Sequence, residues 1–109
     1  MILKIKYLYS DFPDRWDYLK GTERLEIPSD IDLYELGKMI YGHFEIPDGR
    51  SFAFYMDNDT RKRGNNYSDY TENGYKDARG VKLTEALRSN KFKYEYSFSD
   101  GIIFQCTVE

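Results

Sequence analysis

The chain has 109 residues, a formal net charge of −3 at pH 7, a hydrophobic fraction of 40% and a charged fraction of 32%. This length suits one domain that buries most of its apolar surface without disulfides or metals. No stretch approaches the roughly 20 apolar residues of a transmembrane helix. Met1–Lys6 alternates apolar with basic residues and lacks the apolar block of a signal peptide. A single cysteine, Cys106, excludes a disulfide framework. We therefore expect one domain over residues 1–109, cytoplasmic and without membrane association.

Period-two alternation predicts three strands in the first half of the chain. Residues 2–9, 22–27 and 50–56 place apolar side chains at every second position, as in strands with one buried face. Pro28 ends the second of these because proline has no N–H for a ladder hydrogen bond. In the third strand, the side chains predicted to face the core are Phe52, Phe54 and Met56, and those predicted to face away are Ser51, Ala53 and Tyr55.

One long helix is predicted to begin after Asp32. Asp32 and Glu35 form the two ends of a capping box, in which each side chain satisfies a backbone N–H of the first turn. The apolar stripe follows helical spacing and comprises Leu33, Leu36, Met39 or Ile40, and Phe44. Pro47 is predicted to end the helix.

A long polar loop is predicted over residues 57–80, followed by a short helix over residues 82–89 with Thr84 as a possible cap. A connection of about two dozen residues is long for a compact domain, and such loops are usually functional or disordered. The side chains of the short helix predicted to face inward are Leu83, Ala86 and Leu87.

The C-terminal stretch predicts a β-hairpin with two apolar series, one on each strand. A two-residue loop would place these series on opposite faces, whereas the three-residue loop Ser99–Gly101 places them on one face, so burial favours the three-residue loop. Gly101 would then occupy the left-handed position of the turn. The predicted pairs are Phe98 with Ile102, Tyr96 with Phe104, Tyr94 with Cys106, and Phe92 with Val108, all facing inward. The element order predicts an α+β fold: a mostly antiparallel or mixed sheet of about five strands, with one main helix on one face and one short helix, broadly β-grasp-like.

Three blocks of the sequence resemble a known family. Leu25–Leu36 resembles its strand, Pro-x-Asp cap and helix, and Asp77–Leu87 resembles its short helix. Phe92–Val108 resembles its signature, an aromatic-rich strand followed by Phe-Gly-Asp-Gly-Trp and a closing strand, with Ser99 and Ile102 replacing the first glycine and the tryptophan. This is the plasmid pRiA-type ORF-three-like family, whose members also occur with transposable elements. The resemblance runs from the second predicted strand onward and implies the α+β fold. It implies little about activity, because the family is essentially uncharacterised.

Motifs for catalysis or metal binding do not fit the predicted fold. Asp57-Asn-Asp-Thr60 has the spelling of an aspartate-nucleophile phosphatase of the haloacid-dehalogenase type, but such enzymes need a parallel α/β sheet. The acidic residues of the loop lack EF-hand spacing. His43, the only histidine, lies in the last helical turn, where a structural or solvated side chain is expected. Cys106 is predicted to be a buried packing thiol. The sequence therefore predicts no catalytic residue, metal or cofactor.

The aromatic fraction of 17%, with 11 tyrosines, favours a contact surface, because tyrosine is enriched at interfaces. The candidate binding residues combine basic charge with aromatic rings in the polar loop and are Arg61, Lys62, Arg63, Tyr67, Tyr70 and Tyr75. The first hypothesis is a non-catalytic protein-binding module with a protein partner. The alternative is a nucleic-acid-associated accessory protein of a plasmid or transposable element, which the net charge disfavours. An enzyme with an unrecognised site is the third hypothesis, and a homo-oligomer formed through an exposed edge strand is possible.

Overall fold

The structure is a computed structural model that describes residues 1–46 and 49–109. The strands are β1 (Ile2–Tyr9), β2 (Thr22–Glu26), β3 (Phe52–Tyr55), β4 (Asn66–Ser68), β5 (Lys76–Asp77), β6 (Lys91–Tyr96) and β7 (Ile102–Val108). The helices are α1 (Pro13–Trp16), α2 (Leu33–His43) and α3 (Leu83–Ala86), together with two 3-10 turns, η1 (Asp17–Leu19) and η2 (Glu72–Gly74).

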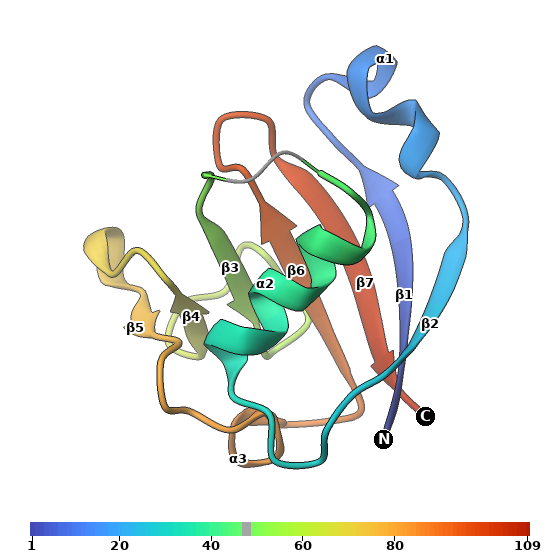
Figure 1. The fold of residues 1–109 in the computed structure, drawn as a ribbon. Helices are drawn as coiled ribbons and strands as arrows, with labels where there is room; N and C mark the ends of the chain where they lie inside the picture. The colour runs from blue at the N-terminus through green and yellow to red at the C-terminus, as the bar shows by residue number, and fades with distance from the viewer. Residues whose placement is uncertain (47–48) are drawn as a thin grey trace.

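All strands belong to one mixed sheet in the order β2-β1-β7-β6-β3-β4-β5. Neighbouring strands are antiparallel except β4 and β5, which are parallel. Figure 1 shows α2 lying across one face of the sheet, with α1 beyond one end of the strands and α3 beyond the other. The predicted α+β layout with the main helix on one face is confirmed. The predicted number of strands is too low, since the described residues form a 7-stranded sheet.

The two additional strands, β4 and β5, lie in residues 57–80, where the sequence predicts a polar loop. Ser68 Oγ donates to the Phe52 carbonyl at 2.7 Å, and the Ala78 amide donates to the Ser68 carbonyl at 2.9 Å. Pairing with β3 holds β4, and pairing with β4 holds β5, while neither strand is long enough to alternate apolar with polar side chains. Period-two hydrophobicity therefore gives no signal for them.

The cap of α2 forms as predicted at Asp32. Its Oδ1 accepts a hydrogen bond from the Glu35 amide at 2.8 Å, which satisfies one of the free N–H groups of the first turn. The Glu35 carboxylate faces along the helix instead, with Oε1 at 3.3 Å from Lys38 Nζ. The aspartate half of the predicted capping box is therefore the half that holds the helix start.

The apolar stripe of α2 packs against the sheet. Of the two alternatives in the predicted stripe, Ile40 is fully buried, whereas Met39 is 38% exposed. Phe44 is partly buried and its ring centroid lies 4.9 Å from that of Phe104. The helix ends at His43, and Pro47 lies outside the described residues. The stripe side chains buried in the core are Leu33, Leu36 and Ile40.

The C-terminal hairpin forms, but its predicted register is wrong by two residues. Tyr94 lies opposite Phe104 and Tyr96 opposite Ile102, so the loop between the strands is Ser97–Gly101 rather than three residues. A two-residue shift keeps the side chains that remain in the strands on their predicted face, whereas Phe98 leaves the ladder for the loop. The hairpin side chains that are buried in the core as predicted are Phe92, Tyr94, Tyr96, Ile102, Phe104 and Cys106.

Asp100 gives the reason for the longer loop. Its buried carboxylate lies 3.6 Å from Arg15 Nη1 and 3.5 Å from Arg50 Nη1, and it accepts a hydrogen bond from Ser97 Oγ at 3.3 Å. Ser97 and Gly101 both have a φ of 58°, the left-handed region that turns the chain sharply. The hydrogen bond and ion pairs of Asp100 therefore favour the observed strand register. The alternation of apolar residues in the sequence carries no information about them.

The short helix α3 is a single turn, shorter than the predicted 82–89. Its first flanking residue is Lys82, without a side-chain cap, and Thr84 lies inside the helix, so the prediction of Thr84 as the cap is wrong. The Leu33 amide donates to the Val81 carbonyl at 2.8 Å, which ties the start of α3 to the start of α2. No helix in the described part of the chain has the length and apolar character needed to cross a bilayer.

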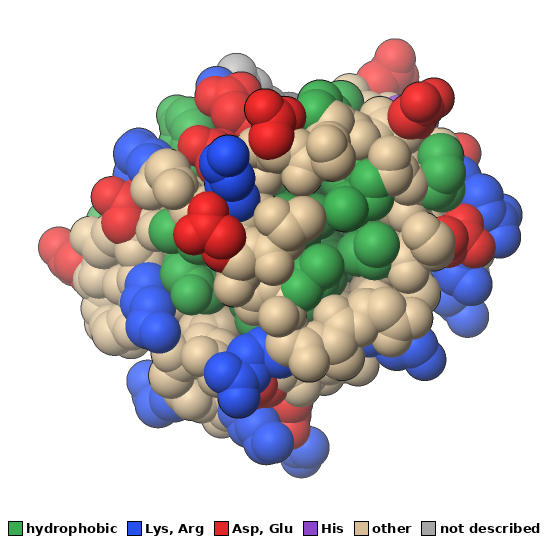
Figure 2. All heavy atoms as spheres, turned by 90° about the horizontal axis from the view of Figure 1, so that it is seen from below, with side chains coloured by type: hydrophobic (Ala, Val, Ile, Leu, Met, Phe, Trp, Pro, Cys, Tyr) green, Lys and Arg blue, Asp and Glu red, His purple; other side chains and the backbone are tan. Residues whose placement is uncertain are grey.

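The face of the sheet away from α2 is called the back face here. Ala53, Tyr55 and Ile103 are buried there, and the chain after β3 crosses it, since the Asn58 carbonyl accepts from Lys93 Nζ at 2.8 Å. Figure 2 shows Lys and Arg side chains gathered along the lower border of the view, which is the back-face side of the molecule. The back face therefore combines buried contacts with a basic surface.

Candidate functional site

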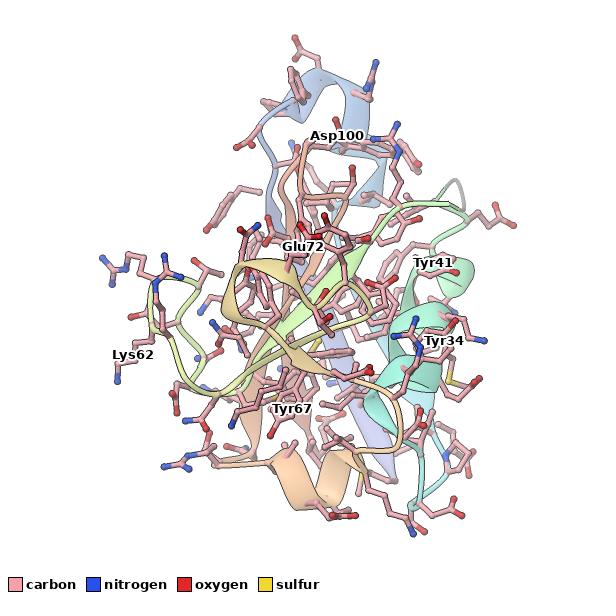
Figure 3. All side chains as sticks on the ribbon, turned by 90° about the vertical axis from the view of Figure 1, so that its left-hand side faces the viewer. Tyr34, Tyr41, Lys62, Tyr67, Glu72 and Asp100 are labelled. Carbon is pink, nitrogen blue, oxygen red and sulfur yellow. The ribbon has the colours of Figure 1, made fainter. Side chains whose placement is uncertain are left out.

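A pocket of about 660 Å³ opens on the back face between residues 60–64, the turn that contains Tyr75, and strands β3 and β6. We call it the basic pocket, because Arg61, Lys62 and Arg63 form part of its lining. In Figure 3, Lys62 lies on the opposite side of the sheet from Tyr34 and Tyr41 of α2. The pocket is thus separated from the main helix by the whole thickness of the sheet.

A carboxylate and two tyrosine hydroxyls form the floor of the basic pocket. Tyr55 OH donates to Glu95 Oε1 at 2.6 Å and lies 2.8 Å from Tyr75 OH. Because the single proton of Tyr55 is committed to Glu95, Tyr75 is the donor in the second bond. Glu95 Oε2 accepts no hydrogen bond within the described part of the chain, and it is not enclosed. One carboxylate oxygen is therefore available to a ligand in the pocket.

Burial changes the titration of this floor. Desolvation raises the pKa of Glu95, and it outweighs the hydrogen bond from Tyr55, which acts in the opposite direction. Desolvation also raises the pKa of Tyr55, with the hydrogen bond to Glu95 as the next cause. The nearest lysine on the same strand, Lys93, has its Nζ bonded to Asn58. Glu95 is therefore a partly buried acid without a cationic partner among the described side chains, and such groups are candidates for functional sites.

The rim of the basic pocket carries exposed positive charge. Arg61 Nε and Nη2 donate to the Asp59 carboxylate at 3.1 and 3.3 Å, and these hydrogen bonds lower the pKa of Asp59 and raise that of Arg61. Lys62 and Arg63 are exposed and form no ion pair with other described residues. Two of the three basic side chains are therefore free to meet an anionic group.

The six predicted site residues do not form one cluster. Arg61, Lys62, Arg63 and Tyr75 line the basic pocket. Tyr67, on β4, pairs with Phe54 and is packed partly against the core, with Lys76 Nζ at 5.5 Å from its ring centroid. Tyr70 is 45% exposed, and its hydroxyl donates to Glu72 at 2.8 Å, which raises the Tyr70 pKa. The structure thus brings together the basic residues and one of the three tyrosines.

The pocket residues that were absent from the predicted site include Tyr55, Glu95 and Phe98. Tyr55 and Glu95 occupy outward positions of strands that the sequence predicts, so their alternation places both on the back face. Phe98 was predicted to face the core, and this is wrong, because the longer hairpin loop removes it from the ladder. Its ring instead stacks on that of Tyr75, with centroids 5.6 Å apart and an angle of 10°.

The motifs set aside on sequence grounds have local partners in the structure. Asp57 accepts from Asn65 Nδ2 at 2.9 Å and lies 3.5 Å from Arg88 Nε. His43 Nε2 lies 3.9 Å from Glu23 Oε2. Across residues 1–46 and 49–109, no group of His, Cys, Asp and Glu side chains could hold a metal ion. Cys106 is fully buried, which raises the pKa of its thiol.

Comparison with known families agrees with the sequence resemblance. The model of the plasmid pRiA4b ORF-3-like protein family matches residues 22–109, which include β2 to β7 and the helices α2 and α3. The chain belongs to this family. Every residue named for the basic pocket lies within the matched region, so the pocket is built on the part of the chain that the family defines.

A solved structure has the same fold. The crystal structure of a protein of unknown function from Methanosarcina mazei Go1 aligns with 99% of this chain at a TM-score of 0.73 and 17% sequence identity. This chain spans 57% of the length of that protein. At this identity the similarity concerns the fold alone. No curated protein matches the chain.

The pocket has the chemistry of a recognition site that carries both charges. Its floor offers an acceptor oxygen on Glu95 and its rim offers the cations of Lys62 and Arg63. The arrangement is therefore suited to hold a ligand that carries both a cationic and an anionic group.

Proposed function

We propose that the chain is a non-catalytic protein-binding module of the cytoplasm and that its binding site is the basic pocket. The observation that carries this proposal is the open oxygen of Glu95 beneath the exposed charges of Lys62 and Arg63. A ligand that pairs with both the floor and the rim of the basic pocket brings a cation to Glu95 and carboxylates to Lys62 and Arg63. A partner segment with one Lys or Arg side chain between acidic residues has this chemistry.

The same observation supports a protein partner over a nucleic acid at this pocket. A phosphate backbone carries no cation for Glu95, and burial of a carboxylate against an anion is unfavourable. Base stacking needs an accessible aromatic face, and one face of the Tyr75 ring is already stacked on Phe98. A single chain supplies every residue of the pocket, so the proposal needs no second copy.

The test is affinity purification of the tagged chain from its source cell, followed by mass spectrometry. Glu95→Gln removes the floor charge but keeps a hydrogen-bond acceptor for Tyr55, and the double variant Lys62→Gln/Arg63→Gln removes the free rim charges. We expect each to reduce capture of the partner by at least about tenfold, because removal of one member of a buried interfacial charge pair costs about 2–5 kcal/mol.

The matched control is Lys38→Gln/Lys82→Gln, which removes the same charge from the middle of α2 and the start of α3, away from the basic pocket. It is expected to capture the same partner as the wild type. Equal melting temperatures of all variants would exclude unfolding as the cause of a loss. A partner captured equally by the wild type and both pocket variants would show that the basic pocket is not the binding site.

A further inference from the structure

A second basic surface lies on the back face, beyond the basic pocket. Strand register places Lys4 and Lys91 on either side of Thr107 in one cross-strand row, and Lys6 and Lys93 on either side of Gln105 in the next. Neighbouring strands are about 4.8 Å apart and residues two apart on a strand about 6.7 Å apart. The four lysines therefore form a compact rectangle, which we call the lysine face.

The charges of the lysine face are mostly not neutralised within the chain. The ammonium groups of Lys4, Lys6 and Lys91 form no ion pair or hydrogen bond with any other described residue, while that of Lys93 donates to Asn58, a neutral partner. Acidic groups border this face at both ends: Glu109, which pairs with Arg24 at 2.7 Å, and Glu26, opposite Ile2, lie beyond Lys4 and Lys91, and Glu95 follows Lys93 on β6. The net charge of the chain is −3, so these lysines stand out against an acidic molecule.

An exposed aromatic ring adjoins the lysine face. Tyr9, at the end of β1, is 53% exposed and lines a hollow of about 420 Å³ together with Lys93 and Arg61. Register places Tyr9 opposite Ile103 on the back face, past an irregularity in β1 after Tyr7. Unlike Tyr75, Tyr9 makes no ring contact with another described aromatic side chain. It therefore leaves a ring face that an incoming base could cover.

We propose that the lysine face and Tyr9 bind single-stranded nucleic acid without strong sequence preference. Phosphates contact Lys4, Lys6 and Lys91, and a base stacks on Tyr9. Proteins that bind single strands combine a positive track for the backbone with aromatic side chains for the bases. A sheet face without a projecting helix offers this to an unpaired strand, whereas the major groove of a duplex admits a helix or β-ribbon. This surface adjoins the basic pocket, because Arg61 lines both the pocket and the hollow beside Tyr9, but the lysines and the ring that carry it lie outside the pocket. It adds a second ligand to the proposed function.

The experiment is fluorescence anisotropy of a labelled oligothymidylate of about 12 nucleotides, within the range of single-strand site sizes. We expect saturable binding of the full chain at low salt, with affinity falling by about twentyfold between about 50 and 200 mM salt if three phosphates are neutralised. The variant Lys4→Gln/Lys6→Gln/Lys91→Gln should weaken binding by at least about tenfold at low salt and flatten the salt dependence.

Two further variants separate this site from general electrostatic attraction. Tyr9→Ala keeps the net charge and should weaken binding of the oligonucleotide by at least about fivefold, because a stacked base is lost. The matched control Lys38→Gln/Lys82→Gln/Arg88→Gln removes three charges from α2 and the ends of α3 and should retain most of the affinity. Melting temperatures of all variants establish that each is folded.

Three results would overturn the proposal. One is the absence of anisotropy change at low salt, where phosphate contacts are strongest. Another is equal loss of affinity in the two triple variants, which would assign binding to total charge rather than to the lysine face. The third is a polyglutamate peptide or anionic vesicles binding as tightly as the oligonucleotide while Tyr9→Ala has no effect. That result would identify a general anionic partner in place of nucleic acid.

Discussion

The two faces of the sheet use the same strands for different purposes. On the α2 side, Phe52, Tyr94 and Phe104 are fully or almost fully buried, and the ring of Tyr94 contacts those of Phe52 and Phe104. On the back face, the alternate positions of these strands carry Tyr55 and Glu95, with a bonded hydroxyl and carboxylate beside a pocket. The aromatic residues of the hairpin therefore stabilise the fold, whereas the polar residues between them supply the groups of the candidate binding site.

The largest expected contrast lies within β7. Phe104→Ala removes a fully buried ring that contacts Tyr7, Phe44 and Tyr94, so it should lower the free energy of unfolding by about 3–5 kcal/mol. Thr107→Ala, three residues along on the back face, should change it by less than about 1 kcal/mol. Urea denaturation measures both. Similar losses for the two variants would mean that the back face contributes to the core as much as the α2 face does.

The hairpin loop gives the next effect. Gly101→Val should cost about 2–3 kcal/mol, because a β-branched residue resists the left-handed region. Gly101 has a φ of 58°, and a Cβ there would lie 2.7 Å from Asp11 Oδ2. Thermal unfolding checks this, with Ser99→Val at an exposed loop position as the control. If the Gly101 variant has the same melting temperature as the wild type, the loop adopts another conformation.

Two glycines of α2 lie on different sides of the helix: Gly37 is buried and Gly42 is exposed. A Cβ on Gly37 would clash with the Phe52 ring, whereas nothing lies within 4 Å of a Cβ on Gly42. Gly37→Ala should therefore lose about 1–2 kcal/mol net, since overpacking outweighs the gain in helix propensity. Gly42→Ala should gain about 0.5–1 kcal/mol. The same sign for both substitutions, measured by urea denaturation, would contradict this placement of the helix.

The sequence predicts well wherever burial repeats with a fixed period. β1 has the predicted bounds, the α2 cap is Asp32, and the buried face of the hairpin is correct despite the shifted register. The errors in the hairpin loop and in residues 57–80 have one physical cause, which is hydrogen bonding between polar groups that lie far apart in the sequence. The Asp100 network lengthens the hairpin loop, and hydrogen bonds to the edge of β3 turn part of the 57–80 stretch into strands. Neither leaves a periodic hydrophobic signal.

The candidate site was predictable only in part, because its residues come from segments far apart in the chain. Local composition identifies Arg61, Lys62 and Arg63, and alternation identifies Glu95 as an outward position. Their meeting depends on the pairing of β3 with β6 and on the path of the chain after β3. In the sequence, Lys4 and Lys6 have the pattern of an ordinary solvated strand face. Only the pairing of β7 with β1 and with β6 shows that Lys91 and Lys93 lie in the same rows.

The smallest expected effect tests the floor of the basic pocket through its pH dependence. Because the pKa of Glu95 is raised in the folded chain, mainly by desolvation, the folded state binds more protons than the unfolded state in the window above the ordinary glutamate pKa of about 4.3. The stability contributed by Glu95 is therefore fully present below that pKa and is lost as pH rises through the folded value.

Glu95→Gln removes this titration while keeping an acceptor for Tyr55. Urea denaturation at about pH 4 and about pH 7 should therefore show the variant gaining stability relative to the wild type as pH rises. The gain should stay below about 1 kcal/mol, because the carboxylate retains contact with solvent. The exposed Glu85→Gln, which removes one surface carboxylate, is the matched control. A difference for Glu95→Gln that stays constant between the two pH values would mean that the Glu95 carboxylate is solvated like a surface residue. The back face would then lack the buried acid that distinguishes it from the aromatic face.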